Sequence, residues 1–324
     1  MNRKKTGARL ACLVVAASLL GLASSSAAQE AYPTKPIEVV NSFAAGGIND
    51  LTFRAISTVV EKYLGQPMVQ QIKAGGGGAV GTTEAALARP DGYKLLIASA
   101  GELVVAPNIS KVSYTLDSFV PIARMVTASY TIVVRADARW GDIEQFIKEA
   151  KERPGQLSLA TTRGGGYITL ADFQNKAGVS LNHVPYPGFG PSLVALLGGH
   201  VDSALISTPV AEPQVQAGKA RMLALTGPVR VDAYRNVPTL KELGIDVSFT
   251  QWVGMFAPRA IAPERLARLR SAFERVVKDQ EFLARSAQLG VSISYLPGPE
   301  FLSAIQKEDV EVRALVKQLG IGVK

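Results

Sequence analysis

The stretch FAAGGIND, residues 43–50, carries most of the information about the fold. It follows an apolar run at 37–40 that predicts a strand, and it precedes residues 51–64, whose apolar spacing predicts a helix. A glycine pair between a strand and a polar helix start forms a concave turn whose backbone N–H groups point outward. Such a turn can bind an anion without a charged side chain, so it favours binding over catalysis.

The chain upstream of this turn has the pattern of a secretory signal peptide over residues 1–28. The apolar run at 10–23 has fourteen residues, whereas a membrane-spanning helix needs about twenty. We therefore expect the segment to be cleaved and the chain to be exported to the periplasm. The alternative is that the segment is retained as a membrane anchor. The supporting residues are the cations Arg3, Lys4, Lys5 and Arg9 and the small residues Ser26, Ala27 and Ala28 at the cleavage site.

The cysteine content narrows the chemistry of the exported chain. The single cysteine, Cys12, lies inside the expected signal peptide. A mature chain without thiols excludes a disulfide scaffold, thiol catalysis and cysteine-based metal sites.

The charge of the mature chain is modest. Removing the four signal-peptide cations lowers the formal charge from +8 to about +4 over the remaining 296 residues. The basic residues are interleaved with acids, as at 263–275, and do not form a cluster. A nucleic-acid footprint would be clustered and accompanied by exposed aromatics, so we expect no nucleic-acid partner. The expected product is a soluble periplasmic monomer.

Strand and helix patterns alternate along the whole mature chain, which favours an α/β fold with mostly parallel sheets covered on both faces. No flexible linker divides the chain, so two domains of ordinary size would be joined by strands that cross between them. The expected strands are 37–42, 68–72, 94–99, 130–135, 157–161, 181–185, 203–207, 220–226 and 249–256. The expected helices are 50–64, 80–88, 142–152, 167–177, 190–198, 209–217, 263–278, 280–288 and 299–318.

The strands that pass from one domain to the other define the expected domain boundaries. The apolar runs at 122–135 and 247–257 are the candidate crossing strands. The tail from 258 onward carries no strand pattern and is expected to pack as helices on the first domain. These assignments give a first lobe of 29–128 plus 252–324 and a second lobe of 129–251.

One glycine motif resembles a dinucleotide site but lacks its context. Gly76-x-Gly78-x-x-Gly81 matches G-x-G-x-x-G, yet it follows the second strand, and the next strand ends at Ser99 without an acid. Thr82 stands where a P-loop would have lysine. We therefore expect a structural turn or a cleft rim here, and no nucleotide cofactor.

Catalytic and metal-binding constellations are scarce. The two histidines, His183 and His200, lack metal-ligand spacing to another His, Cys or acid. The chain has no G-x-S-x-G elbow, and no nucleophile–base pair can be assembled. We expect both histidines to be structural, no metal site, and no enzymatic activity.

A set of motifs then runs through the whole mature chain in one order. They are YPTKPIEVV at 32–40, F-x-A-G-G-x-x-D at 43–50, AGGGGAVG at 74–81, RPDGYKLL at 89–96, RPGQLS at 153–158, HVPYPG at 183–188, LLGGHVD at 196–202, QAGKARMLALTG at 216–227, VPTLKELG at 237–244 and GMFAP at 254–258. In these motifs the chain resembles the tripartite tricarboxylate transporter solute receptors, the Bug family of TctC-like proteins.

The resemblance implies a two-lobed, type II-like periplasmic binding protein that holds a small carboxylate in its cleft and delivers it to a membrane permease. It also implies that the first turn holds a ligand carboxylate through backbone groups and ordered waters. In this chain the corresponding groups are the backbone of Ala45, Gly46 and Gly47, with Asn49 and Asp50. The alternative role for Asn49 or Asp50 is a plain helix cap.

A second glycine-rich turn follows the expected strand 157–161 and is placed to clasp the other end of the ligand. The chain departs from the resembled pattern at Arg163, Tyr167 and Thr169. Arg163 either contacts a second carboxylate or faces solvent, and Tyr167 is placed to stack on an aromatic ring. The ligand is therefore expected to be a dicarboxylate or an aromatic acid. The candidate residues are Thr161, Thr162, Arg163, Gly164, Gly165, Gly166 and Tyr167.

Further cleft candidates lie just beyond strand carboxyl ends, where open α/β sheets bind ligands. They are Ser99, Ala100, Pro185, Tyr186, Ser207 and Thr208. The alternative function is a ligand sensor that docks a sensor-kinase ectodomain in place of a permease, since both would use the closed lobes.

Overall fold

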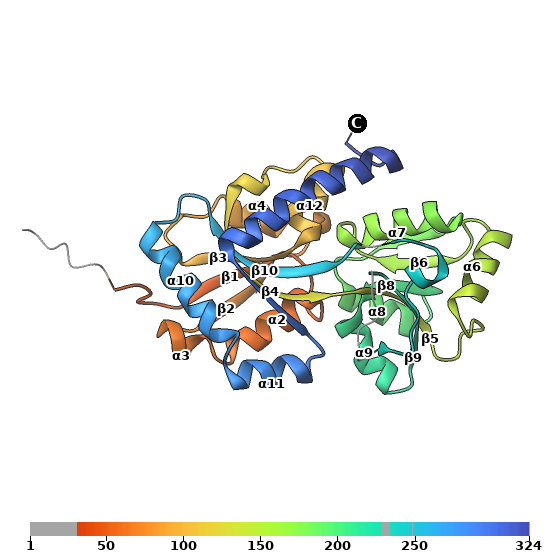
Figure 1. Ribbon diagram of the computed structural model, residues 1–324, viewed down its shortest axis with the longest axis horizontal. Helices are drawn as coiled ribbons and strands as arrows, with labels where there is room; N and C mark the ends of the chain where they lie inside the picture. The colour runs from red at the N-terminus through yellow and green to blue at the C-terminus, as the bar shows by residue number, and fades with distance from the viewer. Residues whose placement is uncertain (1–30, 228–233, 248, 324) are drawn as a thin grey trace, which may run out of the picture.

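The computed structural model describes residues 31–227, 234–247 and 249–323. It has two α/β lobes side by side, as the alternation of elements predicts (Figure 1). The expected signal peptide at 1–28, with Cys12, lies outside the described residues.

The first lobe is built on a six-stranded sheet with the order β11-β4-β10-β3-β1-β2. β1 pairs in parallel with both β2 and β3, whereas β10 is antiparallel to β3 and β4, and β11 is antiparallel to β4. Its strands are β1 Ile37–Asn41, β2 Met68–Ile72, β3 Lys94–Ser99, β4 Phe119–Ala128, β10 Gln251–Pro258 and β11 Ser292–Pro297. Its helices are α2 Ile48–Ser57, α3 Val60–Leu64, α4 Ala79–Ala86, α5 Ala106–Ile109, α10 Pro263–Val276, α11 Gln280–Gln288 and α12 Gly298–Leu319.

The second lobe is built on a five-stranded sheet with the order β7-β6-β8-β5-β9. β6 pairs in parallel with β7 and β8, and β5 is antiparallel to β8 and β9. Its strands are β5 Tyr130–Arg135, β6 Ser158–Thr161, β7 Asn182–Pro185, β8 Ser203–Ser207 and β9 Ala220–Leu225. Its helices are α6 Ile143–Glu152, α7 Gly165–Ala177, α8 Phe189–Leu197 and α9 Thr208–Gln216.

Two segments connect the sheets. β4 ends at Ala128 and β5 begins at Tyr130, so the chain leaves the first sheet and enters the second almost without a loop. It returns through β10, which begins at Gln251 (Figure 1). These segments lie within the apolar runs at 122–135 and 247–257 that we expected to cross. Because crossing strands run in both directions, the sheets are mixed and not mostly parallel.

The prediction of an entirely helical tail was wrong. β11 lies within the tail and pairs with β4 at the edge of the first sheet. The strand signals of β11 and of the start of β4 are weak, because Pro297 and Pro121 interrupt the pattern, and proline within strands is confined to edges and bulges. The register of both pairings of β4 is irregular, which accommodates these residues. The expected single helix at 50–64 is likewise two helices, α2 and α3.

The lobes are packed against each other. Ile168 of α7, in the second lobe, is fully buried in a core cluster formed mainly by the first lobe, together with Trp252 and Phe301. α12 reaches from the first lobe toward α7 (Figure 1). Burial of an isoleucine side chain contributes about 1.5–3 kcal/mol, so this contact stabilises the arrangement in which the lobes are closed.

Candidate functional site

The first glycine-rich turn ends in a helix start without a side-chain cap. Gly47 is the N-cap of α2 and carries no side-chain capping hydrogen bond, so the first N–H groups of the helix lack the usual side-chain acceptor. Gly46 adopts φ +78°, a left-handed conformation that favours glycine. The turn therefore presents the positive end of α2 to the space in front of it.

The side chain of Asp50 binds the backbone of this turn and a side chain of α2. Its Oδ2 accepts the backbone N–H of Gly46 at 2.9 Å and forms an ion pair with Arg54 at 2.9 Å. The N–H of Gly46 is thus occupied within the chain. Because Gly46 precedes the N-cap residue Gly47, Asp50 ties the turn to the helix and is not the plain helix cap that we considered as its alternative role. The donors that remain toward the cleft belong to Gly47 and the first residues of α2.

A small cavity lies in front of α2 and is lined by both lobes. The first lobe contributes Phe43, Gly47, Ile48 and Asn49, the second contributes Thr162 and Phe189, and Gln251 comes from the crossing strand β10. Its volume is ≈ 10 Å³, which is about the room needed for one water molecule. The lobes are therefore closed on this site, and a larger ligand enters only when they separate.

Two buried acceptors in the cavity lining lack a partner. Asn49 and Gln251 are 2% and 3% exposed, and neither Asn49 Oδ1 nor Gln251 Oε1 accepts a hydrogen bond from the described residues. A buried polar atom without a partner costs about 1–3 kcal/mol. A ligand or water that donates to these atoms would remove that cost, so the cavity is suited to a polar guest.

The carboxylate of Glu102 holds the side-chain amide of Asn49 in place. This fully buried residue lies in the π-helical turn Gly101–Val105 that follows β3, and its carboxylate accepts hydrogen bonds from Asn49 Nδ2 at 2.8 Å and Ser42 Oγ at 3.2 Å. The backbone N–H of Ser99 at 2.9 Å and the Ser99 hydroxyl also donate to it. Burial raises the pKa of the Glu102 carboxyl. Asn49 Nδ2 is thus held by Glu102, and Oδ1 is the amide atom of Asn49 that lacks a partner among the described residues.

The second glycine-rich turn meets the first lobe directly. A Cβ on Gly101 would lie 2.9 Å from Gly165 N, and a Cβ on Gly164 would lie 3.1 Å from Gly101 O. Only glycines permit such close backbone contact. Of this turn, Thr162 lines the cavity, whereas Gly164, Gly165 and Gly166 form the contact between lobes or pack within their own turn.

The remaining residues of the second turn have other neighbours. The Thr161 hydroxyl donates to Leu205 O at 2.6 Å and is a structural link between strands. Arg163 is exposed and lies over Gly77 of the first lobe, outside the cavity lining. Tyr167 stacks on His183 with ring centroids 5.2 Å apart, and burial lowers the pKa of that histidine. The aromatic partner of Tyr167 in this structure is thus a side chain of the protein.

The candidates at the strand ends are not among the residues that line the cavity. Ser99 binds Glu102, and Ala100 is buried in the core of the first lobe. Pro185 is exposed and Tyr186 is half-buried at the end of β7. Ser207 is buried with an unpaired hydroxyl, and the N–H of Thr208 donates to Ser129 O at 3.0 Å.

Sequence reasoning missed three residues that line the cavity and one, Glu102, that holds a lining residue in place. Phe43 and Phe189 each stand beside a glycine turn, and that adjacency was the available signal. Gln251 and Glu102 carried no local signal, because their positions depend on the crossing strand and on the π-helical turn. The two lobes also meet through a backbone hydrogen bond, in which the N–H of Ala44 donates to Pro187 O of the other lobe at 3.1 Å.

Comparison with known proteins assigns the chain and its fold to a class of proteins. A profile of the tripartite tricarboxylate transporter family receptors matches residues 52–321, and the chain belongs to this family. It is similar to the UPF0065 protein in the gbd 5′ region of Cupriavidus necator, with 31% identity over 99% of each chain.

Two solved structures show the same architecture. The periplasmic binding protein BugD is 28% identical, with a TM-score of 0.86 over 90% of this chain and 100% of BugD. MatC of Rhodopseudomonas palustris, described with bound malate, is 27% identical, with a TM-score of 0.81 over 88% of this chain and 100% of MatC. Among the described residues, no helix has both the length and the apolar character required to span a membrane.

Proposed function

We propose that this chain is a periplasmic receptor that captures a small carboxylate between its lobes and delivers it to a tripartite tricarboxylate-type membrane permease. The observation that carries the proposal is the cavity at the uncapped start of α2, which residues of both lobes line. Residues 1–28 would direct export of the chain.

Binding would begin at the open first lobe. A carboxylate at the start of α2 accepts the N–H groups of Gly47 and the first helical residues, and the helix dipole favours its charge. Closure then brings Thr162 and Phe189 over the ligand and excludes water. A few charge-assisted hydrogen bonds, each worth about 1.5–3 kcal/mol, are sufficient for micromolar affinity, near −8 kcal/mol, after the ordering costs.

The ligand class follows from the cavity walls and from the relatives. The malate described in MatC supports a small hydroxy dicarboxylate. The rings of Phe43 and Phe189, which line the same cavity, support an aromatic acid, because the ring of such a ligand can pack against them in offset or edge-to-face contacts. Asn49 Oδ1 and Gln251 Oε1 favour a ligand that also carries a hydroxyl or amino donor.

The test is a thermal-shift panel of mono-, di- and aromatic carboxylates, followed by calorimetry. A ligand at 100 times its Kd should stabilise the protein by about 2.7 kcal/mol. The matching alcohols, which lack the carboxylate, serve as controls. The absence of a shift across the whole panel, or an equal shift with the alcohols, would contradict the proposal. Loss of uptake in a strain that lacks the gene, with ligand-induced transcription intact, would support permease delivery.

A further inference from the structure

The two oxygens of the Glu102 carboxylate bind different parts of the first lobe. Oε2 accepts the backbone N–H of Ser99 at 2.9 Å and the Ser99 hydroxyl, so it closes a local loop between residues three apart in the chain. Oε1 accepts Asn49 Nδ2 at 2.8 Å and Ser42 Oγ at 3.2 Å. Ser42 and Asn49 stand at the two ends of the first glycine-rich turn. Oε1 therefore ties both ends of that turn to the π-helical turn that follows β3.

An acid at this position has no simple stabilising role. Glu102 is fully buried, and the groups of Ser42, Asn49 and Ser99 that donate to its carboxylate are all uncharged. Burial raises the pKa of the carboxyl, because the charged form is costly in this environment. Replacing a buried polar group and its partners by apolar groups of the same shape is often nearly neutral for stability. Stability alone therefore does not account for this carboxylate.

The glycine motif at 76–81 gives this carboxylate and one of its donors their space. Gly78 adopts φ +99°, and a Cβ on it would lie 2.6 Å from Glu102 Cγ. A Cβ on Gly81 would lie 3.0 Å from the Cα and the Cβ of Ser42. Side chains at these two positions would push Glu102 or Ser42 out of place. The stretch that resembles a dinucleotide motif therefore packs around the contacts of Glu102.

The backbone beside Glu102 touches the second lobe. Gly101 begins the π-helical turn Gly101–Val105, and a Cβ on it would lie 2.9 Å from Gly165 N. From the other side, a Cβ on Gly164 would lie 3.1 Å from Gly101 O and 3.2 Å from Gly101 C. The peptide unit that joins Gly101 to Glu102 is thus part of the contact between the lobes. Because this unit is planar and rigid, a shift of Glu102 moves the contact surface as well.

From these contacts we propose that Glu102 is a positioning residue, which fixes the carboxylate-binding turn relative to the contact between the lobes. This inference rests on the proposed carboxylate function. A ligand at the start of α2 has to meet Thr162 and Phe189 when the second lobe stops against Gly101. Binding groups have to be held within about 0.5 Å of their working geometry, and the side chain of Glu102 spans the turn and the contact. Because coupling between two events is reciprocal, binding should favour closure as much as closure favours binding.

Two variants remove the link to the first turn and keep the local one. In Glu102→Gln the fixed N–H of Ser99 requires an oxygen, so the amide nitrogen takes the place of Oε1 and faces Asn49 Nδ2, a second donor. Asn49 then turns its amide or loses the bond, and either result alters the cavity lining. Glu102→Asp keeps the charge but is one methylene too short to reach both Ser99 and Asn49. In calorimetry, both variants should bind malate and benzoate about tenfold more weakly than the wild type.

A double variant tests the connection to the lobe contact. In Gly164→Ala the new Cβ would lie 3.1 Å from Gly101 O, so closure should be hindered and binding weakened about tenfold. If Glu102 acts through this contact, the double variant with Glu102→Gln should lose about tenfold to twentyfold, and not the roughly hundredfold expected of independent effects. A purely structural role of Glu102 would give the full loss.

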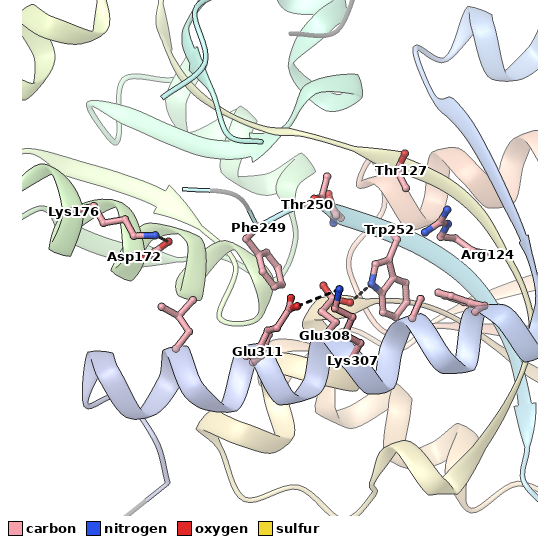
Figure 2. Close-up of a pocket in the computed structure, with 15 residues that line it drawn as sticks. Arg124, Thr127, Asp172, Lys176, Phe249, Thr250, Trp252, Lys307, Glu308 and Glu311 are labelled. Carbon is pink, nitrogen blue, oxygen red and sulfur yellow. Dashed lines mark hydrogen bonds and ion pairs between the residues drawn. The ribbon is translucent and has the colours of Figure 1, made fainter. Parts of the chain in front are cut away.

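Glu308 supplies the matched control. Figure 2 shows this acid on α12 beside Trp252, whose indole N–H it accepts at 2.5 Å. Like Glu102, it accepts a neutral donor near the junction of the lobes, but neither Glu308 nor Trp252 lines the carboxylate cavity. Glu308→Gln keeps an oxygen for Trp252 and should bind both acids as the wild type does.

Wild-type affinity in both Glu102 variants, or the full loss in the double variant, would overturn the proposal. If the wild type binds no carboxylate of the panel, the proposed function fails by itself. The radius of gyration of ligand-free Glu102→Asp, measured by X-ray scattering, then decides the positioning role. A value larger than that of the wild type supports it, and an equal value overturns it. If the shorter side chain prevents folding, Glu102→Gln takes its place in this measurement.

Discussion

The two glycine-rich turns of this protein have similar sequences and different environments. The first, at 43–50, leads into α2 and opens onto the cavity. The second, at 161–167, leads into α7, yet its glycines meet the backbone of Gly101 in the opposite lobe. A strand, a glycine run and a helix start can thus serve the proposed carboxylate binding only where nothing else covers the helix start. At the second turn the same local features permit a close contact between lobes.

The largest expected effect comes from breaking the contact at the second turn. In Gly101→Ala the new Cβ would lie 2.9 Å from Gly165 N, closer than real contacts allow, so the lobes cannot close fully. We expect a loss of ligand affinity of about 100-fold, or about 3 kcal/mol. Calorimetry measures the affinity, and X-ray scattering should show a larger radius of gyration. Gly141→Ala, where the Cβ would find only ordinary contacts, is the control, and unchanged affinity in Gly101→Ala would refute the role of the contact.

The next largest effect tests the first turn. Asn49→Ala removes the unpaired acceptor in the cavity and the hydrogen bond to Glu102. Ligand affinity should fall about tenfold, corresponding to about 1.5 kcal/mol. Calorimetry with the best carboxylate of the panel measures the change. Asn175→Ala, an exposed position on α7, should bind as the wild type does. If both variants bind equally well, Asn49 has no part in the site.

The two turns should also differ in how pH affects their stability. Burial raises the pKa of Glu102, beneath the first turn, so the folded chain holds this proton more tightly than the unfolded chain. Its contribution to stability should therefore fall as pH rises above the usual carboxyl value of 4.5. Burial lowers the pKa of His183, beside the second turn, so its contribution should fall as pH drops below 6.5.

Urea unfolding at a series of pH values measures this difference. Glu102→Gln should flatten the slope of the unfolding free energy above pH 4.5. His183→Phe keeps a ring against Tyr167 and should flatten the slope below pH 6.5. If either variant changes the slope in the opposite sense, the assignment of that group is wrong.

The smallest expected effect concerns Arg163. Because this side chain is exposed and lies outside the cavity lining, Arg163→Ala should change carboxylate affinity by less than about threefold. Parallel titrations with a monocarboxylate and a dicarboxylate measure the change. A selective loss of dicarboxylate affinity would show instead that Arg163 reaches a second carboxylate in the bound state. Both turns would then contact the ligand.

The predictions from sequence were accurate where a pattern is local. The strands at 94–99, 130–135 and 203–207 were predicted to the residue, because each is a short apolar run with clear ends. β11 was missed as a strand, and the start of β4 before the crossing run at 122–135 was missed too, since a strand that carries proline and pairs irregularly has no clear period. Glu102 was missed because nothing around it in the sequence marks a π-helical turn.

The sequence alone determined the α/β class, the strand-to-helix glycine turns and the family resemblance, because glycine conformation and hydrophobic period act over a few residues. Only the tertiary structure decided that the start of α2 faces a cavity while the start of α7 faces Gly101. It also brought Gln251 to the cavity and placed Glu308 beside Trp252. These arrangements join residues that are far apart in the chain, and they depend on how two lobes close about their crossing strands.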